Sequence, residues 1–523
     1  MAKAAKTVKA SKGFEETLWE SANKLRGSVE SAEYKHVVLS LIFLKFISDK
    51  FEQRKLAVIE QYGGDFVDMV DFYTMENVFY LPEEARWSHV LKHAKQDGLA
   101  LIIDTAMSTV EKNNASLVGA LPDNYFSRLD LDASKLASLI DTINNIDTIA
   151  NECHMSEEDV VGRVYEYFLG KFAASEGQRG GEFYTPKCVV SLIAEMLEPY
   201  KGKIYDPCCG SGGMFVQSLQ FIEAHQGSQK DVSIYGQEYA NTTRKLAKMN
   251  LAIRGMAGNL GDVAGDTFFK DQHPDLKADF IMANPPFNQS KWRQDSELTD
   301  DPRWAAYSVP PVGNANYGWI MHMVSKLSEQ GTAGFVLANG SMSSNTNSEG
   351  TIRQQIIEDD LVECMIALPG QLFYTTQIPV CLWFLTKDKG ENTDKGYRKR
   401  NGETLFIDAR NMGSMISRKQ KELTLDDIAE IARTYHAWRG EAKDGVYEDV
   451  AGYSKSASFD EIKANDFVLT PGRYVGAAEL EDDGIPFEVK MAELTSKLGE
   501  QFAESAKLEG QIKVNLKGLG YEF

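Results

Sequence analysis

The chain has 523 residues, of which 43% are hydrophobic and 25% are charged, and its formal net charge is −20. This composition is typical of globular proteins, and the length exceeds one average domain, so we expect two or three domains. The most apolar stretch, residues 37–51, is shorter than the roughly 20 residues that span a bilayer. It also contains Lys45 and Asp49, and we therefore expect a buried core helix there and no membrane association.

The acidic net charge restricts how the chain could act on nucleic acid. Affinity for phosphates depends largely on Lys and Arg, so a chain with a charge of −20 should bind duplex DNA poorly by itself. Either its basic residues gather on one face, or a partner subunit supplies most of the contacts.

Residues 1–13 contain four lysines but no apolar block or cleavage site of a secretory signal. We expect a flexible basic tail there and a cytoplasmic location. The six cysteines form no C-x-x-C pair and are expected to be reduced thiols, which argues against a zinc site. They are Cys153, Cys188, Cys208, Cys209, Cys364 and Cys381.

Residues 14–155 show no alternation typical of strands. Apolar residues recur instead at steps of three and four, as in Leu136, Leu139 and Ile143. This periodicity predicts an all-helical N-terminal domain.

Within residues 156–475, short apolar runs alternate with helical patterns between about 203 and 387. The runs read IYDPC, VSIYGQE, ADFIMANP, TAGFVLAN, LVECMIALP and PVCLWFLT. Buried strands that alternate with helices predict a parallel, doubly wound α/β sheet of the Rossmann type. In such a sheet, ligands bind at the carboxyl ends of the strands.

The tail, residues 476–523, has apolar residues mostly at steps of three and four from Met491 to Leu516. The pattern predicts a helix with one apolar stripe, although Gly499 and Gly510 weaken it. Two interpretations stay open, a docking helix for a partner and an ordinary helix that packs on its own domain.

A glycine-rich turn follows the first expected strand. It reads Asp206-Pro-Cys-Cys-Gly-Ser-Gly-Gly213 and precedes a helix that should begin near Met214. Glycines permit a tight turn and close approach of a ligand to the backbone. A plain turn or a dinucleotide site would fit as well, whereas a Walker loop is excluded because no G-K-S/T follows.

Glu238 stands at the end of the next expected strand. A carboxylate at this position can accept hydrogen bonds from both hydroxyls of a ribose, as in dinucleotide-binding folds. The alternative is a solvated surface acid.

The most specific motif is Asn284-Pro285-Pro286-Phe287, directly after an expected strand. The two prolines make this segment rigid, and the Asn284 side chain and Pro285 carbonyl could accept both hydrogens of an exocyclic amine. Such contacts draw the lone pair of the nitrogen out of conjugation and direct it at an incoming methyl group. Phe287 would stack on a base that has left the duplex, whereas the alternative is a turn that closes a strand.

Together these motifs resemble the modification subunits of type I restriction-modification systems, within the gamma-type N6-adenine methyltransferases. The resemblance also covers the stretches LWESANKLRGSVESAEYKHVVL, LPGQLFYTTQIPVCLWFL and LTPGRYVG. It implies that the catalytic residues are Asn284, Pro285, Pro286 and Phe287. It implies that the S-adenosyl-L-methionine site is formed by Gly181, Glu182, Phe183, Tyr184, Thr185, Pro186, Asp206, Ser211, Gly212, Gly213, Glu238 and, less directly, Asp266.

The resemblance also implies partners. In such systems a separate specificity subunit reads the DNA sequence, two modification subunits flank it, and a restriction subunit is an optional further component. Methyl transfer to an amine requires alignment of donor and acceptor more than a strong base, so neither a metal nor a cysteine nucleophile is expected. Two basic clusters, residues 395–400 and Arg418, Lys419 and Lys421, are candidates for phosphate contacts or for solvated loop charge.

Three other functions compete with this interpretation. A protein glutamine methyltransferase could present an amide on the same motif, but the long helical N-terminal region argues against it. A stand-alone adenine methyltransferase would need recognition modules that the chain lacks. A non-catalytic scaffold conflicts with the intact motifs.

Overall fold

The structure is a computed structural model that describes residues 19, 31–129, 131–145, 167–168, 171, 185–373, 377–418, 420–477 and 487–518. The chain divides into two compact units, residues 1–476 and residues 477–523.

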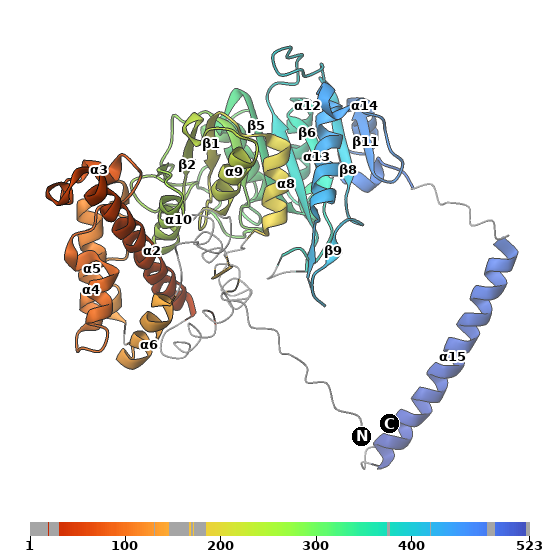
Figure 1. The fold of residues 1–523 in the computed structure, drawn as a ribbon. Coiled ribbons are helices and arrows are strands. Elements are labelled where there is room, and N and C mark those ends of the chain that lie inside the picture. Colours follow the sequence, from red (N-terminus) through yellow and green to blue (C-terminus); the bar gives the residue numbers. More distant parts are fainter. Residues whose placement is uncertain are drawn as a thin grey trace. The chain divides into compact units, whose positions relative to one another are not determined.

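The N-terminal part of the first unit is helical in its described residues, as predicted (Figure 1). Val37–Phe51 lies within the first long helix, and its apolar side chains are buried. This core extends to Leu246, Met249 and Ile253, so the N-terminal helices pack against a helix of the following α/β region. The α-helices are α2 (Ser31–Tyr62), α3 (Asp71–Thr74), α4 (Trp87–Lys92), α5 (Leu99–Asn113) and α6 (Ala133–Asn144).

A nine-stranded sheet forms the centre of the first unit, in the order β11-β8-β6-β7-β5-β4-β1-β2-β3. All strands are parallel to β1 except β7, which is antiparallel to both neighbours, and β11, which is antiparallel to β8. The strands are β1 (Gly202–Asp206), β2 (Val232–Gly236), β3 (Gly258–Asn259), β4 (Ala278–Ala283), β5 (Leu327–Ala338), β6 (Val362–Ala367), β7 (Val380–Thr386), β8 (Glu403–Asp408) and β11 (Ser454–Ser458).

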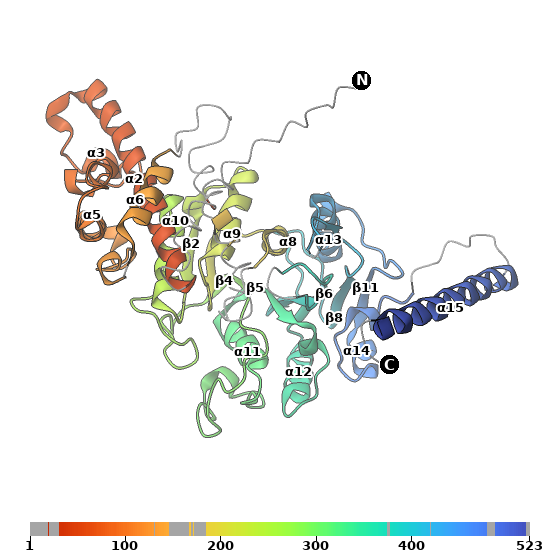
Figure 2. The same cartoon turned by 90° about the horizontal axis from the view of Figure 1, so that it is seen from below.

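Helices cover both faces of the sheet, which Figure 2 shows as three layers. One buried cluster joins β-strand side chains to α8, α9, α10 and α13, and another joins them to α11, α12 and α14. Because both faces are covered, β6 and β7 are buried at every residue. The helices are α8 (Lys187–Leu197), α9 (Gly213–Ala224), α10 (Asn241–Ile253), α11 (Asn316–Lys326), α12 (Glu349–Glu358), α13 (Leu425–Arg439) and α14 (Phe459–Ala464).

The fold class and the six expected strands are confirmed. The expectation of a wholly parallel sheet is wrong for β7, which hydrogen-bonds β5 and β6 in antiparallel fashion. A fully buried strand such as β7 has the same apolar pattern in either direction.

The position of the site follows from the strand order. β1 pairs in parallel with β2 on one side and with β4 on the other. The strand order therefore reverses at β1, and in open α/β sheets ligands bind beyond the carboxyl ends of the strands at such a switch point.

The second unit contains one long helix, α15 (Phe487–Gly518). Apolar side chains along it are exposed, among them Met491, Leu494, Leu498, Phe502, Leu508 and Ile512. In the described part of the chain, no helix combines the length and the apolar character that crossing a membrane requires.

Candidate active site

The loop after β1 turns tightly at two glycines. Gly210 and Gly212 have positive φ values of 53° and 83°, a conformation that costs other residues roughly 1–2 kcal/mol. Among the described residues, and chain neighbours aside, a Cβ atom added at Gly210 or Gly213 would meet no heavy atom within 4 Å. The loop backbone therefore borders open space that a ligand can approach closely.

Glu238 lies two residues beyond β2, and its carboxylate fastens this loop. Oε2 accepts the Gly210 amide at 3.0 Å, and Oε1 accepts the Ala240 amide at 2.8 Å. The side chain is half-buried. Since each carboxylate oxygen can accept more than one hydrogen bond, the same group is suited to receive ligand hydroxyls.

The loop that carries Asp266 interlocks with the two loops just described. The Thr267 hydroxyl donates to the Pro207 carbonyl at 2.6 Å, and the Gly265 amide donates to the Glu238 carbonyl at 3.0 Å. Asp266 is half-buried, and its carboxylate accepts the amide two residues ahead at 2.8 Å. These bonds bring Asp266 and Glu238 into one cluster with the glycine loop.

Asn284 follows β4, beside the end of β1. Its Nδ2 donates to the Thr185 hydroxyl at 2.9 Å, across 99 residues of sequence. Thr185 and Pro186 immediately precede α8. The expected site residues Gly181, Glu182, Phe183 and Tyr184 lie outside the described residues.

The segment Asn284-Pro285-Pro286-Phe287 is also held at its Phe287 end, by side chains of two later segments. Phe287 contacts Phe373 edge to face, with ring centroids 5.8 Å apart. Asn288 has a left-handed φ of 52°. Its backbone amide donates to Asn316 Oδ1 at 3.1 Å, and Asn316 Nδ2 donates to Asn288 Oδ1 at 3.0 Å. Asn316 is 1% exposed, so this pair rigidly fixes the chain after Phe287.

Burial shifts the titratable groups of the glycine loop toward their neutral forms. Asp206 is buried, and loss of solvation raises its pKa to about 7, against the opposing hydrogen bonds from Cys208. Burial likewise raises the pKa values of the Cys208 and Cys209 thiols well above their usual range. A reactive cysteine needs a lowered pKa, so burial disfavours the thiolate form that a cysteine nucleophile requires.

Two contacts of this site were not foreseen from sequence, Thr185 on Asn284 and Phe373 on Phe287. Thr185 was expected to line the cofactor site and Phe373 only to belong to a matching stretch. Each pair is separated by more than 80 residues, and the printed sequence carries no signal for pairing over that distance.

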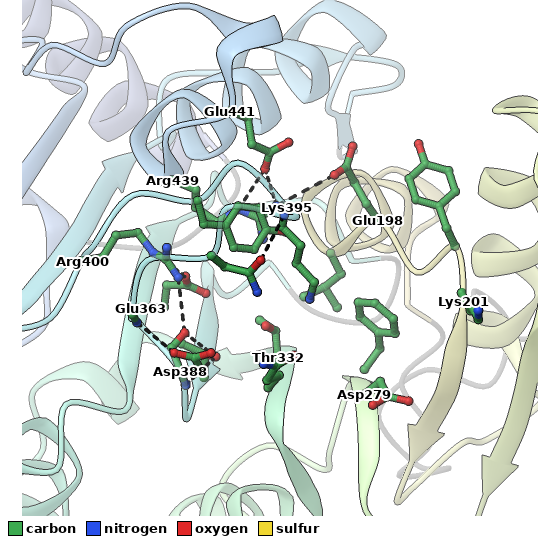
Figure 3. A pocket seen from close by; sticks show the side chains of 18 residues that line it. Glu198, Lys201, Asp279, Thr332, Glu363, Asp388, Lys395, Arg400, Arg439 and Glu441 are labelled. Carbon is green, nitrogen blue, oxygen red and sulfur yellow. Dashed lines mark hydrogen bonds and ion pairs between the residues drawn. The ribbon is translucent and has the colours of Figure 1, made fainter.

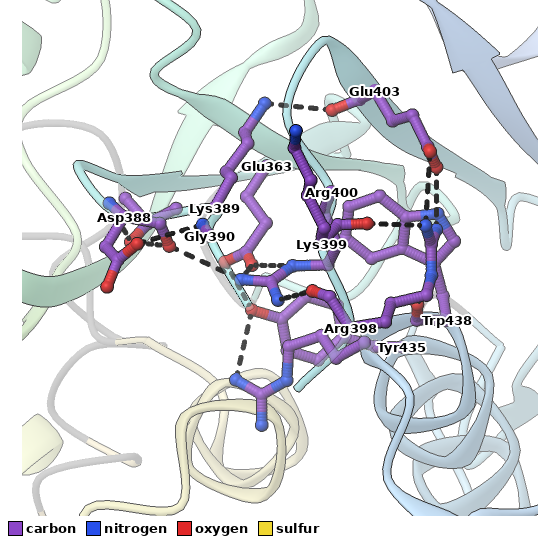
Figure 4. Close-up of polar contacts among 12 residues, drawn as sticks. Glu363, Asp388, Lys389, Gly390, Arg398, Lys399, Arg400, Glu403, Tyr435 and Trp438 are labelled. Atoms are coloured by element: carbon purple, nitrogen blue, oxygen red, sulfur yellow. Dashed lines mark hydrogen bonds and ion pairs between the residues drawn. The ribbon is translucent and has the colours of Figure 1, made fainter. Parts of the chain in front are cut away.

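The two arginines of the basic cluster at residues 395–400 are held in internal contacts and are not free to serve as phosphate ligands (Figure 4). Arg400 is 2% exposed and pairs with buried Glu363 at 3.1 Å. Arg398 forms a bidentate pair with Glu403. The expectation of solvated loop charge is therefore wrong for these two arginines, because each has an acidic partner within the fold, whereas Lys395 and Lys399 are exposed.

A polar cavity of ≈ 470 Å³ lies at the opposite edge of the sheet (Figure 3). It is bordered by Asp279 on β4 and Thr332 on β5, by Arg439 at the end of α13, and by Glu441 just beyond that helix. Glu198, His436 and Glu441 gather within 4.8 Å near this cavity, a grouping that could hold a metal ion. Arg439 and Lys443 already neutralise the two carboxylates, so the cluster is an ion-pair network.

Comparison with known proteins identifies the family of the chain. Residues 156–483 match the family described as N-6 DNA Methylase, and residues 14–143 match the HsdM N-terminal domain. The chain is 52% identical over 457 residues to the type I restriction enzyme HindI methylase subunit of Haemophilus influenzae, covering 84% of this chain and 100% of that protein. It is 40% identical over 527 residues to the MjaIX methylase subunit of Methanocaldococcus jannaschii, covering 97% of this chain and 92% of the relative.

Among solved structures, the fold is similar to the type I restriction-modification methyltransferase subunit from Streptococcus thermophilus. The TM-score is 0.72 at 23% identity, and the match covers 88% of this chain and 99% of that one. At this identity the likeness concerns the fold alone.

Proposed function

The chain belongs to the methylase subunits of type I restriction enzymes and is an adenine-specific DNA methyltransferase, and from this premise we propose its chemistry in detail. It transfers the methyl group of S-adenosylmethionine to N6 of an adenine that has left the duplex. A separate specificity subunit selects the sequence. The observation that carries this proposal is Asn284, held by Thr185 at the switch point beside the glycine loop.

The residues beside that loop fit S-adenosylmethionine. Open space borders Gly210 and Gly213, and Glu238 presents an anchored carboxylate at the same loop. We assign Gly181 to Pro186, Asp206, Ser211 to Gly213, Glu238 and Asp266 to this site. When bound, the cofactor supplies a methyl group on a positively charged sulfur.

The contact with Thr185 orients the Asn284 amide. Its NH₂ end donates to the hydroxyl, so the opposite end of the amide, Oδ1, is the acceptor for the target amine. The Pro285 carbonyl accepts the second amine hydrogen, and Phe287 stacks on the base. Both contacts turn the nitrogen lone pair toward the methyl donor, and alignment of this kind is the main requirement of an in-line transfer.

Partner subunits account for the acidic net charge of −20. We propose that two copies of this chain flank one specificity subunit, which supplies most DNA contacts, and that a restriction subunit joins as an optional component. The exposed apolar side chains of α15 are the docking surface for the specificity subunit.

The experiment is transfer of a labelled methyl group to duplex DNA, with and without the specificity subunit, followed by digestion of the product. We expect N6-methyladenine only when both subunits are present. Labelled DNA in the absence of the specificity subunit would contradict the proposal that this subunit supplies most DNA contacts. No label in either reaction, with S-adenosylmethionine still bound, would identify a non-catalytic scaffold.

Asn284→Ala in the same complex tests the catalytic assignment. It should abolish transfer while cofactor binding persists, because the acceptor for the target amine is removed. Asn401→Ala is the matched control, since Asn401 is exposed beyond the opposite edge of the sheet. Normal transfer by the Asn284 variant would overturn the assignment.

A further inference from the structure

The second basic cluster, unlike the first, lies on a hairpin. Strands β9 (Ser414–Met415) and β10 (Lys421–Glu422) pair antiparallel, and Figure 1 shows β9 running away from the body of the sheet. We call residues 412–423 the arm; residue 419 lies outside the described residues. The arm contains Arg418, Lys419 and Lys421 against one acidic residue, Glu422, in a chain with a net charge of −20.

The base of the arm is rigid. Gly413 has a φ of 82°, and a Cβ atom there would lie 2.8 Å from the Glu422 carbonyl oxygen. The Lys421 ammonium donates to the Met412 carbonyl at 3.0 Å. At the turn, the Ile416 amide donates to the Gln420 carbonyl at 3.0 Å, which joins the two sides of the hairpin.

The arm lies at the catalytic edge of the sheet. It follows β8, which is parallel to β6, and β7 lies antiparallel between β6 and β5. β8 therefore points in the same direction as β1 and β4, and its carboxyl end, Asp408, leaves the sheet on the side where Asp206 and Asn284 lie.

Direct contacts connect the arm to the candidate active site. The Lys421 amide donates to the Gln371 carbonyl at 3.0 Å, and Gln420 Nε2 donates to the Leu372 carbonyl at 3.2 Å. The next residue, Phe373, packs on Phe287. On the other side, Ser414 and Glu422 share a cleft of ≈ 280 Å³ with Lys187, which follows Thr185-Pro186 directly.

The tip presents chemistry suited to DNA. Arg418 is exposed, and no hydrogen bond or ion pair of its guanidinium occurs within the described residues. Met415 and Ile416 are 50% and 54% exposed. Proteins that distort a duplex combine basic side chains, which contact phosphates, with apolar side chains, which contact or separate neighbouring base pairs.

We propose that the arm is a DNA-contacting element of the methyltransferase, which binds the duplex beside the target adenine. Arg418 contacts a backbone phosphate, and Met415 and Ile416 contact the bases that lose a stacking neighbour when the adenine leaves the helix. This inference rests on the proposed function, since it assigns the duplex to the catalytic edge.

The test uses the complex of this chain with its specificity subunit and a duplex that contains the recognition sequence. Arg418→Glu should weaken DNA binding about tenfold at moderate salt. It should also make the slope of log affinity against log salt concentration shallower, by about the amount that one phosphate contact contributes. Lys399→Glu is the matched control, because Lys399 is exposed near the amino ends of the strands and the charge change is the same. S-adenosylmethionine binding should stay unchanged in both variants and reports their folding.

A second variant tests the apolar part. Met415→Ser combined with Ile416→Ser should lower the fluorescence increase of 2-aminopurine placed at the target position, because fewer target bases leave the stack. Normal DNA affinity and salt dependence of Arg418→Glu, or an unchanged 2-aminopurine signal in the double variant, would overturn the proposal.

Two further outcomes separate the possible failures. Loss of the specificity subunit from the Arg418→Glu complex would show that the arm binds protein, which also overturns the proposal. If the unaltered complex transferred no methyl group to DNA, the proposed function itself would fail.

Discussion

The amide nitrogen of Asn284 donates to the hydroxyl of Thr185 at 2.9 Å, although 99 residues separate them in the sequence. The bond connects the proposed catalytic segment, residues 284–287 after β4, to the segment that precedes α8. In the structure, Oδ1 is the end of the Asn284 amide that faces away from Thr185. In the proposed mechanism that end is Oδ1, the acceptor of the target amine.

Thr185→Val should therefore lower kcat, because valine has nearly the same shape but no hydroxyl to hold the amide. A lost hydrogen bond of a half-buried group corresponds to a decrease of about 10- to 100-fold. The kcat and the KM values for DNA and cofactor should be measured separately, since a role confined to cofactor binding would raise only the cofactor KM. Thr185→Ser keeps the hydroxyl and should restore kcat; equal loss in both variants would contradict a role for the hydrogen bond.

Asp206 predicts a pH dependence of stability. Burial raises its pKa to about 7, so the folded chain holds this proton more tightly than the unfolded chain, whose carboxyl titrates near 4. Between these pH values the unfolded state binds fewer protons, and the contribution of Asp206 to stability falls as the pH rises.

Asp206→Asn removes this titration and keeps an oxygen that can accept the Cys208 amide. The free energies of unfolding of both proteins should be measured with urea at pH 5 and pH 8. The variant should gain stability relative to the unaltered chain at the higher pH. A difference between the two proteins that is the same at both pH values would contradict the raised pKa.

The local features were predictable because they depend on neighbouring residues. The strands that end at or shortly before Asp206, Glu238 and Asn284 follow from short apolar runs, and the turn at residues 210–213 follows from its glycines. The helical N-terminal region follows from its three- and four-residue periodicity. These patterns sufficed to place three candidate groups at the carboxyl ends of strands.

The remaining features depend on contacts distant in sequence. The direction of β7 is set by its hydrogen bonds to β5 and β6, and a strand buried on both faces does not encode direction in its apolar pattern. Arg400 looked like a surface charge because Glu363, its partner, lies 37 residues away on β6. A count of charges cannot distinguish an exposed arginine from one whose acidic partner is supplied by the fold.

The Glu363–Arg400 pair leads to a stability prediction. Glu363 is 1% exposed and also accepts the Tyr435 hydroxyl at 2.7 Å. Glu363→Ala leaves Arg400 buried without its acidic partner, which should lower the free energy of unfolding by about 3–5 kcal/mol. Urea unfolding measures this loss, and Lys399→Ala, an exposed neighbour, should change stability by less than about 0.5 kcal/mol. If Glu363→Ala were as mild as the control, the pair would not be a stabilising element of this fold.

The C-terminal helix α15 offers a test of the docking proposal that leaves the first unit intact. Leu498 and Phe502 are four residues apart, so they lie on one face of the helix, and they are 47% and 68% exposed. If a specificity subunit covers them, replacing both with serine removes two buried apolar side chains from the interface, worth about 1.5–3 kcal/mol each. Affinity for the specificity subunit should then fall by about a hundredfold or more.

The matched control is the double serine replacement of Lys497 and Gln501, which have the same spacing on a different face of α15. Serine has a similar helix propensity in both variants, so a difference between them reports the apolar face and not helix stability. Titration of labelled specificity subunit measures both affinities, and S-adenosylmethionine binding should be normal throughout. Equal affinities of the two variants would contradict docking through this stripe, because contact through one face predicts that only Leu498 and Phe502 are buried by the partner.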